Sequence, residues 1–345
     1  MLSIMIMAAT LRFFGSAGAE AQLTPASHAS PLNPGNIAAI PYRTNIGDAT
    51  AFMEAATDDK RWKLRAKLRA ETSDQGVDRG EVGEAFVQFA ATDWLDVTAG
   101  RVIEKWGTGY GWTPTAFIGP AKNPTDPGDR RSAYRGRDMI RADVFVKDTN
   151  ISLYALEGGA MAAKVYRLVR GTDVSLVYRR ENGTNDAGVS LSRVFGDALE
   201  VHAEVARTAH TRAVVGAQYT FAGNLNVAFE IYHGTDGLTS RQWQSFRDSI
   251  GDDLRGANAA YAPLRMARTY AFTRVSRPFG KTDIDLIAIT STRDRSTLVR
   301  AGATYKIHPN VSLYAIETEL LGAPDSELAY LQVERITTAG MRVYF

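Results

Sequence analysis

The chain has 345 residues, a formal net charge of +2, no cysteine and a mean hydropathy of −0.20. This hydropathy excludes a helical membrane protein, because no later stretch approaches the roughly 20 apolar residues of a spanning helix. The small charge and the dispersed Lys and Arg residues argue against a nucleic-acid partner, and the lack of cysteine excludes a disulfide framework. A membrane-spanning β-barrel stays compatible, since only every second strand residue faces lipid.

The N-terminal segment has the composition of an export signal. Residues 1–14 are mostly apolar, and residues 15–21 are mostly small. We expect a secretory signal peptide over residues 1–21, cleaved after Ala19 or Ala21, although no Lys or Arg precedes the apolar run and Arg12 interrupts it. Residues 22–60 contain a proline-rich stretch and are expected to form a periplasmic arm. An alternating segment at residues 49–56 is compatible with an extra strand, with an extension of the first expected strand, or with a segment lying in a lumen.

The first expected strand covers residues 61–71 and has two very different faces. Its apolar face carries Trp62, Leu64, Ala66 and Leu68, and its other face carries Lys63, Arg65, Lys67 and Arg69. A soluble β-sandwich does not ordinarily place four consecutive cations on one strand face, whereas a water-filled barrel lumen tolerates them. The segment therefore indicates a membrane barrel.

Alternating segments continue to the end of the chain, and they predict about 16 strands, within a range of 14–18. They cover residues 81–90, 94–102, 139–147, 151–157, 162–170, 173–180, 187–195, 199–208, 212–221, 225–233, 266–278, 283–292, 297–307, 311–319 and 336–345. Tight links alternate with longer ones, of which residues 104–137 and 234–265 are the longest. We expect an all-β, transmembrane antiparallel barrel over residues 61–345, with both termini on the side of the tight turns.

The last strand carries the residues of a family resemblance. Met341, Val343 and the terminal Phe345 share one face with Thr337 and Ala339. This pattern resembles the last strand of bacterial outer-membrane β-barrels, in which it is read by the barrel-assembly machinery. The resemblance implies the outer membrane of a Gram-negative bacterium, with outer-membrane lipid and lipopolysaccharide as further partners.

The link after the third expected strand is rich in Gly, Pro and aromatic residues. Its candidate constriction residues are Trp106, Gly107, Gly109, Tyr110, Trp112, Asn123, Pro124 and Asp126. The glycines allow close backbone approach, and the aromatic residues are able to wedge the loop against a wall. The stretch resembles the inward-folding loop of outer-membrane porins and substrate-specific channels, and more weakly barrels related to alginate-export channels. That likeness implies a loop that narrows the pore.

The charges of this loop and of the strands predict a positive pore. Residues 104–137 contain six bases and three acids. The candidate pore-lining cations are Lys63, Arg65, Lys67, Arg69, Arg130, Arg131, Arg135, Arg141, Arg300 and Arg342. Because charge sets pore selectivity, anionic solutes are favoured. An alternative of equal weight is that these cations pair with acids such as Asp143, Glu204 and Asp285, or contact lipopolysaccharide phosphates.

Catalysis and metal binding are disfavoured by strand phase and spacing. His202 alternates with Glu200 and Glu204 near Ser190 and Ser192, but the phase places it in the lumen, away from acyl substrates. The acids at residues 248, 252 and 253 match no cation loop. We expect a solvated loop there with a helical turn over residues 240–250, and we expect no enzyme activity, metal or cofactor.

These features predict a channel for passive diffusion of small polar, anionic solutes. One alternative is a selective export or uptake channel for an anionic saccharide. Another is a structural or adhesive barrel without conductance, for which residues 22–57 would fill the lumen. A homo-oligomer is compatible with the same features.

Overall fold

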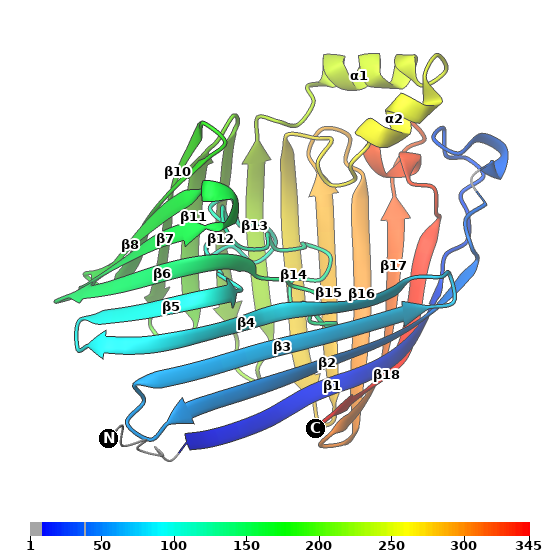
Figure 1. Ribbon diagram of the computed structural model, residues 1–345. Helices are drawn as coiled ribbons and strands as arrows, with labels where there is room; N and C mark the ends of the chain where they lie inside the picture. Colours follow the sequence, from blue (N-terminus) through cyan, green and yellow to red (C-terminus); the bar gives the residue numbers. More distant parts are fainter. Residues whose placement is uncertain (1–8, 38) are drawn as a thin grey trace.

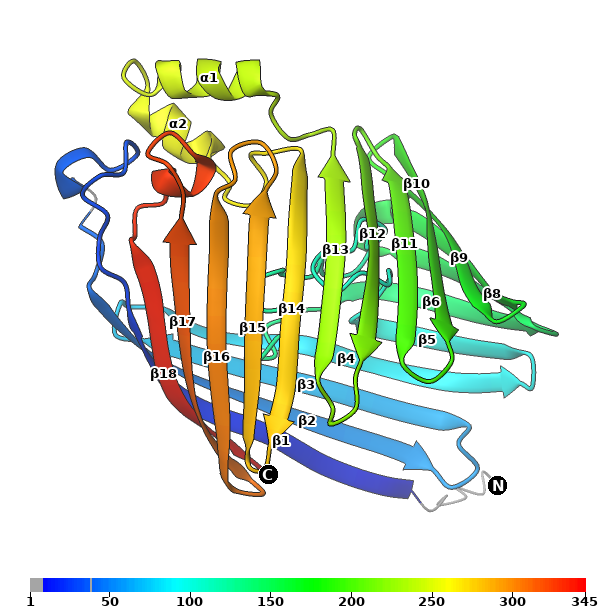
Figure 2. The same ribbon diagram turned by 180° about the vertical axis from the view of Figure 1, so that it is seen from behind.

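The computed structural model describes residues 9–37 and 39–345, and these residues form one closed sheet of 18 antiparallel strands. Each strand pairs with its neighbours in sequence, and β1 pairs with β18 to close the ring (Figures 1 and 2). The expected all-β antiparallel barrel is confirmed. The expected number of about 16 strands is corrected to 18.

The strands have the following bounds: β1 Ala9–Leu23, β2 Arg43–Thr57, β3 Trp62–Ser73, β4 Asp78–Thr92, β5 Leu95–Val102, β6 Arg137–Val146, β7 Thr149–Leu156, β8 Met161–Val169, β9 Thr172–Glu181, β10 Thr184–Phe195, β11 Leu199–Arg207, β12 Thr211–Thr220, β13 Asn226–Gly234, β14 Thr269–Phe279, β15 Thr282–Ser291, β16 Thr297–His308, β17 Val311–Leu321 and β18 Arg335–Tyr344. The helices are α1 Ser240–Ser249 and α2 Leu254–Ala260, with short 3-10 turns η1 Pro34–Asn36, η2 Glu157–Gly159 and η3 Glu327–Tyr330. In the described part of the chain, neither helix is long and apolar enough to cross a bilayer.

The two strands beyond the expected sixteen lie at the N-terminus. Each expected segment from residue 61 onward corresponds to one of the strands β3 to β18. Strand β2 includes the alternating segment at residues 49–56. Strand β1 lies almost entirely within the expected signal peptide, residues 1–21. Ser16 and Glu20 of β1 are buried on the lumenal side, while Ala17 and Ala19 alternate with them on the other face. Lumenal and outward residues therefore alternate along this segment, as in a barrel strand. The alternation is hard to recognise in the sequence because most of these residues are small or apolar.

The connection between β1 and β2 also differs from the expected periplasmic arm. It lies at the end of the barrel opposite the tight turns, where Ala26 forms a bridge with Val333 and the Ser30 hydroxyl donates to the carbonyl of Tyr330. There it packs with α1, α2 and η3 into a cap around Trp243. Since residues 43–57 belong to the wall, residues 22–57 do not plug the lumen.

The two ends of the barrel differ in the length of their connections. The links β4–β5, β6–β7 and β8–β9 take only a few residues each, whereas β5–β6 and β13–β14 are joined by the long excursions at residues 103–136 and 235–268. Figure 1 places the start of β1 and the end of β18 at the end with the tight turns. The strand count is even, so the first strand starts and the last strand ends on the same side of the barrel, as expected.

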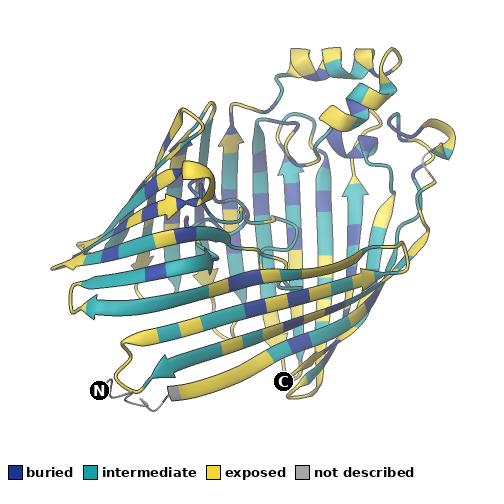
Figure 3. Cartoon of the chain, in the orientation of Figure 1, coloured by how far each residue is buried: buried dark blue, intermediate teal, exposed yellow. Residues whose placement is uncertain are grey.

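The strands separate apolar and polar residues between the two faces of the wall. Along β3, Leu64 and Leu68 are exposed outside, whereas Lys67 and Arg69 are buried inside. Figure 3 shows this alternation along the strands as changes between exposed and buried colours. Met341, Val343 and Phe345 are exposed at the C-terminus, and Arg342 between them is buried. The expected phases of the first and last segments are confirmed.

We expect Leu64→Arg to destabilise the barrel by roughly 2–4 kcal/mol if it lies near the bilayer midplane, because the guanidinium would face lipid. Urea titration of the protein refolded in lipid vesicles measures the change. Lys63→Leu, on the opposite face of β3, is the matched control and should have a small effect. A larger loss for Lys63→Leu than for Leu64→Arg would contradict the orientation of β3.

The mature protein is expected to retain residues 9–23. Removal of β1 after Ala19 or Ala21 would bring β18 next to β2, and these strands run parallel because both are antiparallel to β1. The barrel would then lose the fully antiparallel closure that β1 provides. The intact mass of the protein extracted from outer membranes tests this prediction. A mass that corresponds to a chain beginning at Glu20 or Gln22 would refute it.

Candidate functional site

The connection between β5 and β6, residues 103–136, folds into the barrel, and we call it the inward loop. Figures 1 and 2 show it inside the ring of strands. Its contacts reach distant parts of the wall: Arg130 donates to Glu20 of β1 at 2.6 Å, and Arg179 of β9 donates to the carbonyl of Phe117 at 2.7 Å. The loop therefore crosses the lumen rather than lying along one side.

Glu204 of β11 holds the first part of the inward loop. Its carboxylate accepts backbone N–H bonds from Thr108 at 2.5 Å, Gly109 at 2.7 Å and Thr115 at 3.1 Å, and a hydroxyl bond from Thr115 at 2.7 Å. The side chain is fully buried. Hydrogen bonds to an ionised acceptor are stronger than neutral ones, so this contact replaces the missing strand partners of the loop backbone.

Glu230 of β13 makes a second attachment beside the first. Its carboxylate accepts the backbone N–H groups of Tyr110 and, at 2.8 Å, of Gly111. The same carboxylate lies 2.8 Å from Nε2 of His202, whose Nδ1 lies 3.0 Å from Glu200. The two anchors hold successive residues of the loop, which restricts its movement at this point.

The glycines of the loop are required by this close approach. Gly107 has a φ of +92°, and a Cβ there would lie 2.7 Å from the Glu204 carboxylate. A Cβ on Gly109 would lie 1.9 Å from the carbonyl oxygen of Trp112. Glycine is therefore required at both positions for the loop backbone to lie this close to its neighbours, as expected from the sequence.

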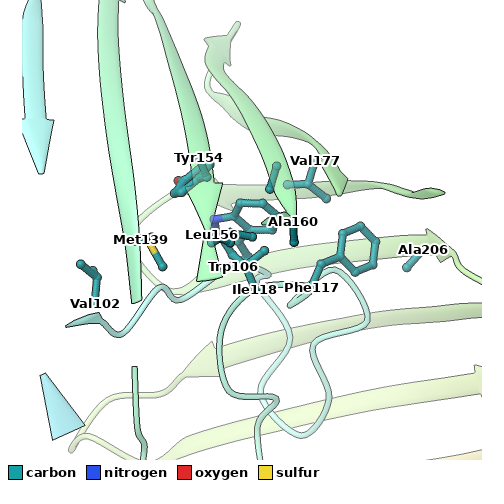
Figure 4. Packing of buried hydrophobic residues seen from close by; sticks show 11 residues of the cluster. Val102, Trp106, Phe117, Ile118, Met139, Tyr154, Leu156, Ala160, Val177 and Ala206 are labelled. Carbon is teal, nitrogen blue, oxygen red and sulfur yellow. The ribbon is translucent and has the colours of Figure 1, made fainter. Parts of the chain in front are cut away.

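Aromatic residues pack both sides of the loop against the wall. Trp106 is buried and meets Tyr154 of β7 edge to face, with ring centroids 5.4 Å apart, within the apolar cluster of Figure 4. Trp112 stacks on Tyr232 of β13 with a centroid distance of 5.0 Å. These contacts have the geometry expected of residues that wedge the loop in place.

The arginines proposed to line the pore are largely paired with carboxylates. The pairs are Arg65 with Glu54 and Glu84, Arg69 with Glu71 and Glu81, Arg130 with Glu20, Arg131 with Glu20 and Glu71, Arg141 with Glu104 and Asp143, Arg300 with Asp285, and Arg342 with Asp48. Arg135 is exposed and makes no ion pair in the described part of the chain. Pairing with acids, the alternative weighed for the sequence, thus describes most of these arginines.

Five lysines on the lumenal side remain without an ion pair among the residues that the structure describes. These are Lys63, Lys67, Lys105, Lys122 and Lys164. Lys67 donates to the carbonyl of Tyr134, and Lys122 donates to the carbonyl of Gly109. Among the cations predicted to line the pore, those without a direct carboxylate contact in the described chain are therefore Lys63, Lys67 and Arg135.

Asn123, Pro124 and Asp126 form the turn of the inward loop. The Asn123 side chain accepts bonds from the backbone and the hydroxyl of Thr125, and Asp126 accepts the backbone N–H of Arg130. Asn123 and Pro124 also line a cavity. These residues shape the loop, and two of them face a space that a solute could enter.

Two cavities lie on either side of the inward loop and share Lys122 and Thr113. The outer cavity, of about 510 Å³, faces the end with long connections, and the inner cavity, of about 410 Å³, lies against β2, β3 and β4. Burial lowers the pKa of Lys122, while the carboxylates of Glu230 and Glu204 act in the opposite direction. In the sequence, Lys122 is only one of the six bases of the loop, because nothing in its spacing indicates that it lines two cavities.

His202 occupies the lumen, as the phase of its strand predicted. It lies between Glu200 and Glu230, and the Ser192 hydroxyl donates to Glu200 at 2.6 Å rather than to the imidazole. This arrangement is a hydrogen-bonded network within the wall. The described residues contain no group of three or more His, Cys, Asp or Glu side chains suited to a metal ion.

Neither the protein-family models nor the curated protein sequences match this chain. Among solved structures, it is similar to a triple mutant of the Rhodopseudomonas blastica porin, with a TM-score of 0.55 and 15% identity over 97% of this chain and 100% of that one. It is also similar to OccK5 (OpdH) of Pseudomonas aeruginosa, with a TM-score of 0.61 and 7% identity over 97% of each chain. These likenesses show the fold, and the expected porin-like barrel is confirmed.

Glu204→Ala is expected to loosen the inward loop while the barrel still forms. Loss of the carboxylate leaves three backbone N–H groups without an acceptor, at a cost of about 1–3 kcal/mol for a buried donor. Hydrogen exchange of the refolded protein should show roughly tenfold or greater loss of protection at Thr108, Gly109 and Thr115.

Glu334→Ala, at an exposed residue near the cap, is the control for this experiment. It should leave the exchange of the inward loop unchanged. Unaltered protection in Glu204→Ala would mean that the packing of Trp106 and Trp112 alone holds the loop.

Proposed function

We propose that this chain is a passive channel in the outer membrane of a Gram-negative bacterium, with a preference for small anionic solutes. The observation that carries the proposal is the inward loop, which crosses the lumen and has a cavity on either side. A barrel wall with a loop held across its bore suits size-limited diffusion, because the narrowest section governs entry.

The outer surface of the barrel supports a membrane location. Exposed large apolar residues recur around the wall, among them Leu64, Leu153, Leu176, Val215 and Leu286. Such a surface would be unfavourable in water and is stabilised in lipid. Lipid and lipopolysaccharide are the corresponding partners, and the exposed Phe345 at the end of β18 is available to the barrel-assembly machinery.

The charge distribution supports the preference for anions. The carboxylates of Glu204 and Glu230 are buried against loop N–H groups, and the lumenal arginines are largely matched by acids. The five lumenal lysines named above make no ion pair with a carboxylate in the described chain. Among them, Lys105 and Lys122 line the inner cavity. A mobile anion passing the loop would therefore meet uncompensated positive charge.

A second candidate is a selective channel for an anionic saccharide. The outer cavity favours it, because Trp112 and Tyr232 lie there beside Lys122 and Arg212. Aromatic faces with nearby cations suit a ring that carries a carboxylate. This candidate differs from general diffusion in that it requires saturable binding.

Planar-bilayer recordings of the refolded protein test the proposal. The wild type should give steady unit conductance and a reversal potential in a KCl gradient that indicates chloride preference. Lys122→Glu and, independently, Lys63→Glu should move that potential toward cation preference. Arg241→Glu, on exposed α1, is the control and should have no such effect.

Three results would count against the proposal. A folded barrel without conductance would indicate the structural or adhesive alternative. A wild type that prefers cations would remove the anion preference but leave the channel. An unchanged reversal potential in both lysine variants would assign the selectivity to other residues.

A further inference from the structure

We propose that the outer cavity is a capture site for an acidic sugar, with the carboxylate held by Lys122 and Arg265 and the ring held against Trp112 and Tyr232. The inference rests on the proposed function, since it assumes that solutes enter from the end with long connections. It deepens the second candidate of the preceding section by assigning the ligand carboxylate to Lys122 and Arg265, the two lining cations that make no ion pair in the described chain.

The outer cavity is built from four parts of the barrel. Its lining comes from the inward loop, from β9, from Thr208, Arg212, Tyr232 and Asp236 at one end of β11, β12 and β13, and from residues 263–267 before β14. Its volume of about 510 Å³ lies within the range of small-molecule sites. The inward loop is fixed on this side by Glu204 and Glu230, so the lining is preorganised rather than formed on binding.

The charges of the lining favour an anion. Four cations and one carboxylate line the cavity. Arg179 is paired with Asp186, and Arg212 is paired with Asp236 at 2.7 Å. The other two cations are Lys122 and Arg265, which make no ion pair in the described part of the chain. A ligand carboxylate would supply the partner that both of them lack.

The remaining lining residues suit a polar ring. The stacked pair of Trp112 and Tyr232 presents aromatic surface, and Phe117 adds to it from the inward loop. Asn123 and Thr208 bring an amide and a hydroxyl to the same cavity, and both groups are able to hydrogen-bond sugar hydroxyls. Apolar surface with a few polar groups is the usual composition of a small-molecule site.

Lys122 lines both this cavity and the inner cavity. The inner cavity is also lined by Lys67 and Lys105. A ligand released from Arg265 while still in contact with Lys122 would meet further lysines on the inner side. The outer cavity is thus placed to concentrate an anion before the constriction.

The first experiment measures binding without conduction. Titration calorimetry of the refolded protein in detergent micelles should detect saturable binding of glucuronate, with glucose and acetate at least tenfold weaker. Arg265→Gln and Lys122→Gln should each weaken glucuronate binding about tenfold. Arg241→Gln, an exposed cation at the same end outside the cavity, is the matched control and should bind as the wild type does.

The second experiment measures block of the chloride current by glucuronate in planar bilayers. Arg265→Gln should lose the block, because Arg265 lines the outer cavity, whereas Arg241→Gln should keep both the unit conductance and the block. Calorimetric binding without any conductance would refute the channel and leave the site. Conductance with equal affinity for glucose and glucuronate, or for acetate and glucuronate, would overturn the site, as would unchanged affinity in both variants.

Discussion

Closure of the sheet through β1 and β18 is the constraint on which the rest of the structure depends. Lipid offers no hydrogen-bond partner, so every backbone N–H and C=O group of the wall needs one in the next strand. Gly15 and Phe345 exchange backbone hydrogen bonds of 2.8 and 3.1 Å at this seam. On the lumenal side, Arg342 of β18 reaches Ser16 of β1 and both carboxylate oxygens of Asp48 on β2. The seam is thereby joined by backbone bonds and by a buried ion pair.

The same requirement explains how a 34-residue segment, residues 103–136, lies inside the barrel without a regular partner strand. Its backbone donors bond to carboxylates of the wall, and Glu204 alone accepts five hydrogen bonds from the loop, three of them from backbone N–H groups. Buried carboxylates are costly unless they are fully hydrogen-bonded, so the loop and the wall depend on each other. A rigid constriction follows from this arrangement.

Charged residues therefore divide between two tasks. Arginine forms fork-shaped contacts, and in this barrel it mostly joins neighbouring strands or ties the inward loop to the wall, as Arg130 does through Glu20. Lysine is a compact and flexible charge, and several lumenal lysines have no carboxylate partner in the described residues. This division leaves Lys122 beside both cavities, whereas Arg130 and Arg131, the cations that the loop sequence made prominent, are held by Glu20.

The sequence by itself determined the barrel class, the strands from β3 to β18 and the faces of β3 and β18, because alternation along a strand is a local property. It also indicated the glycine and aromatic residues of the inward loop. Only the tertiary structure decided the role of residues 9–23, since their partners in β18 lie more than 300 residues away. It likewise decided which cations are paired and that Lys122 faces two cavities, because ion pairs and cavities arise from strands and loops that meet only when the sheet has closed.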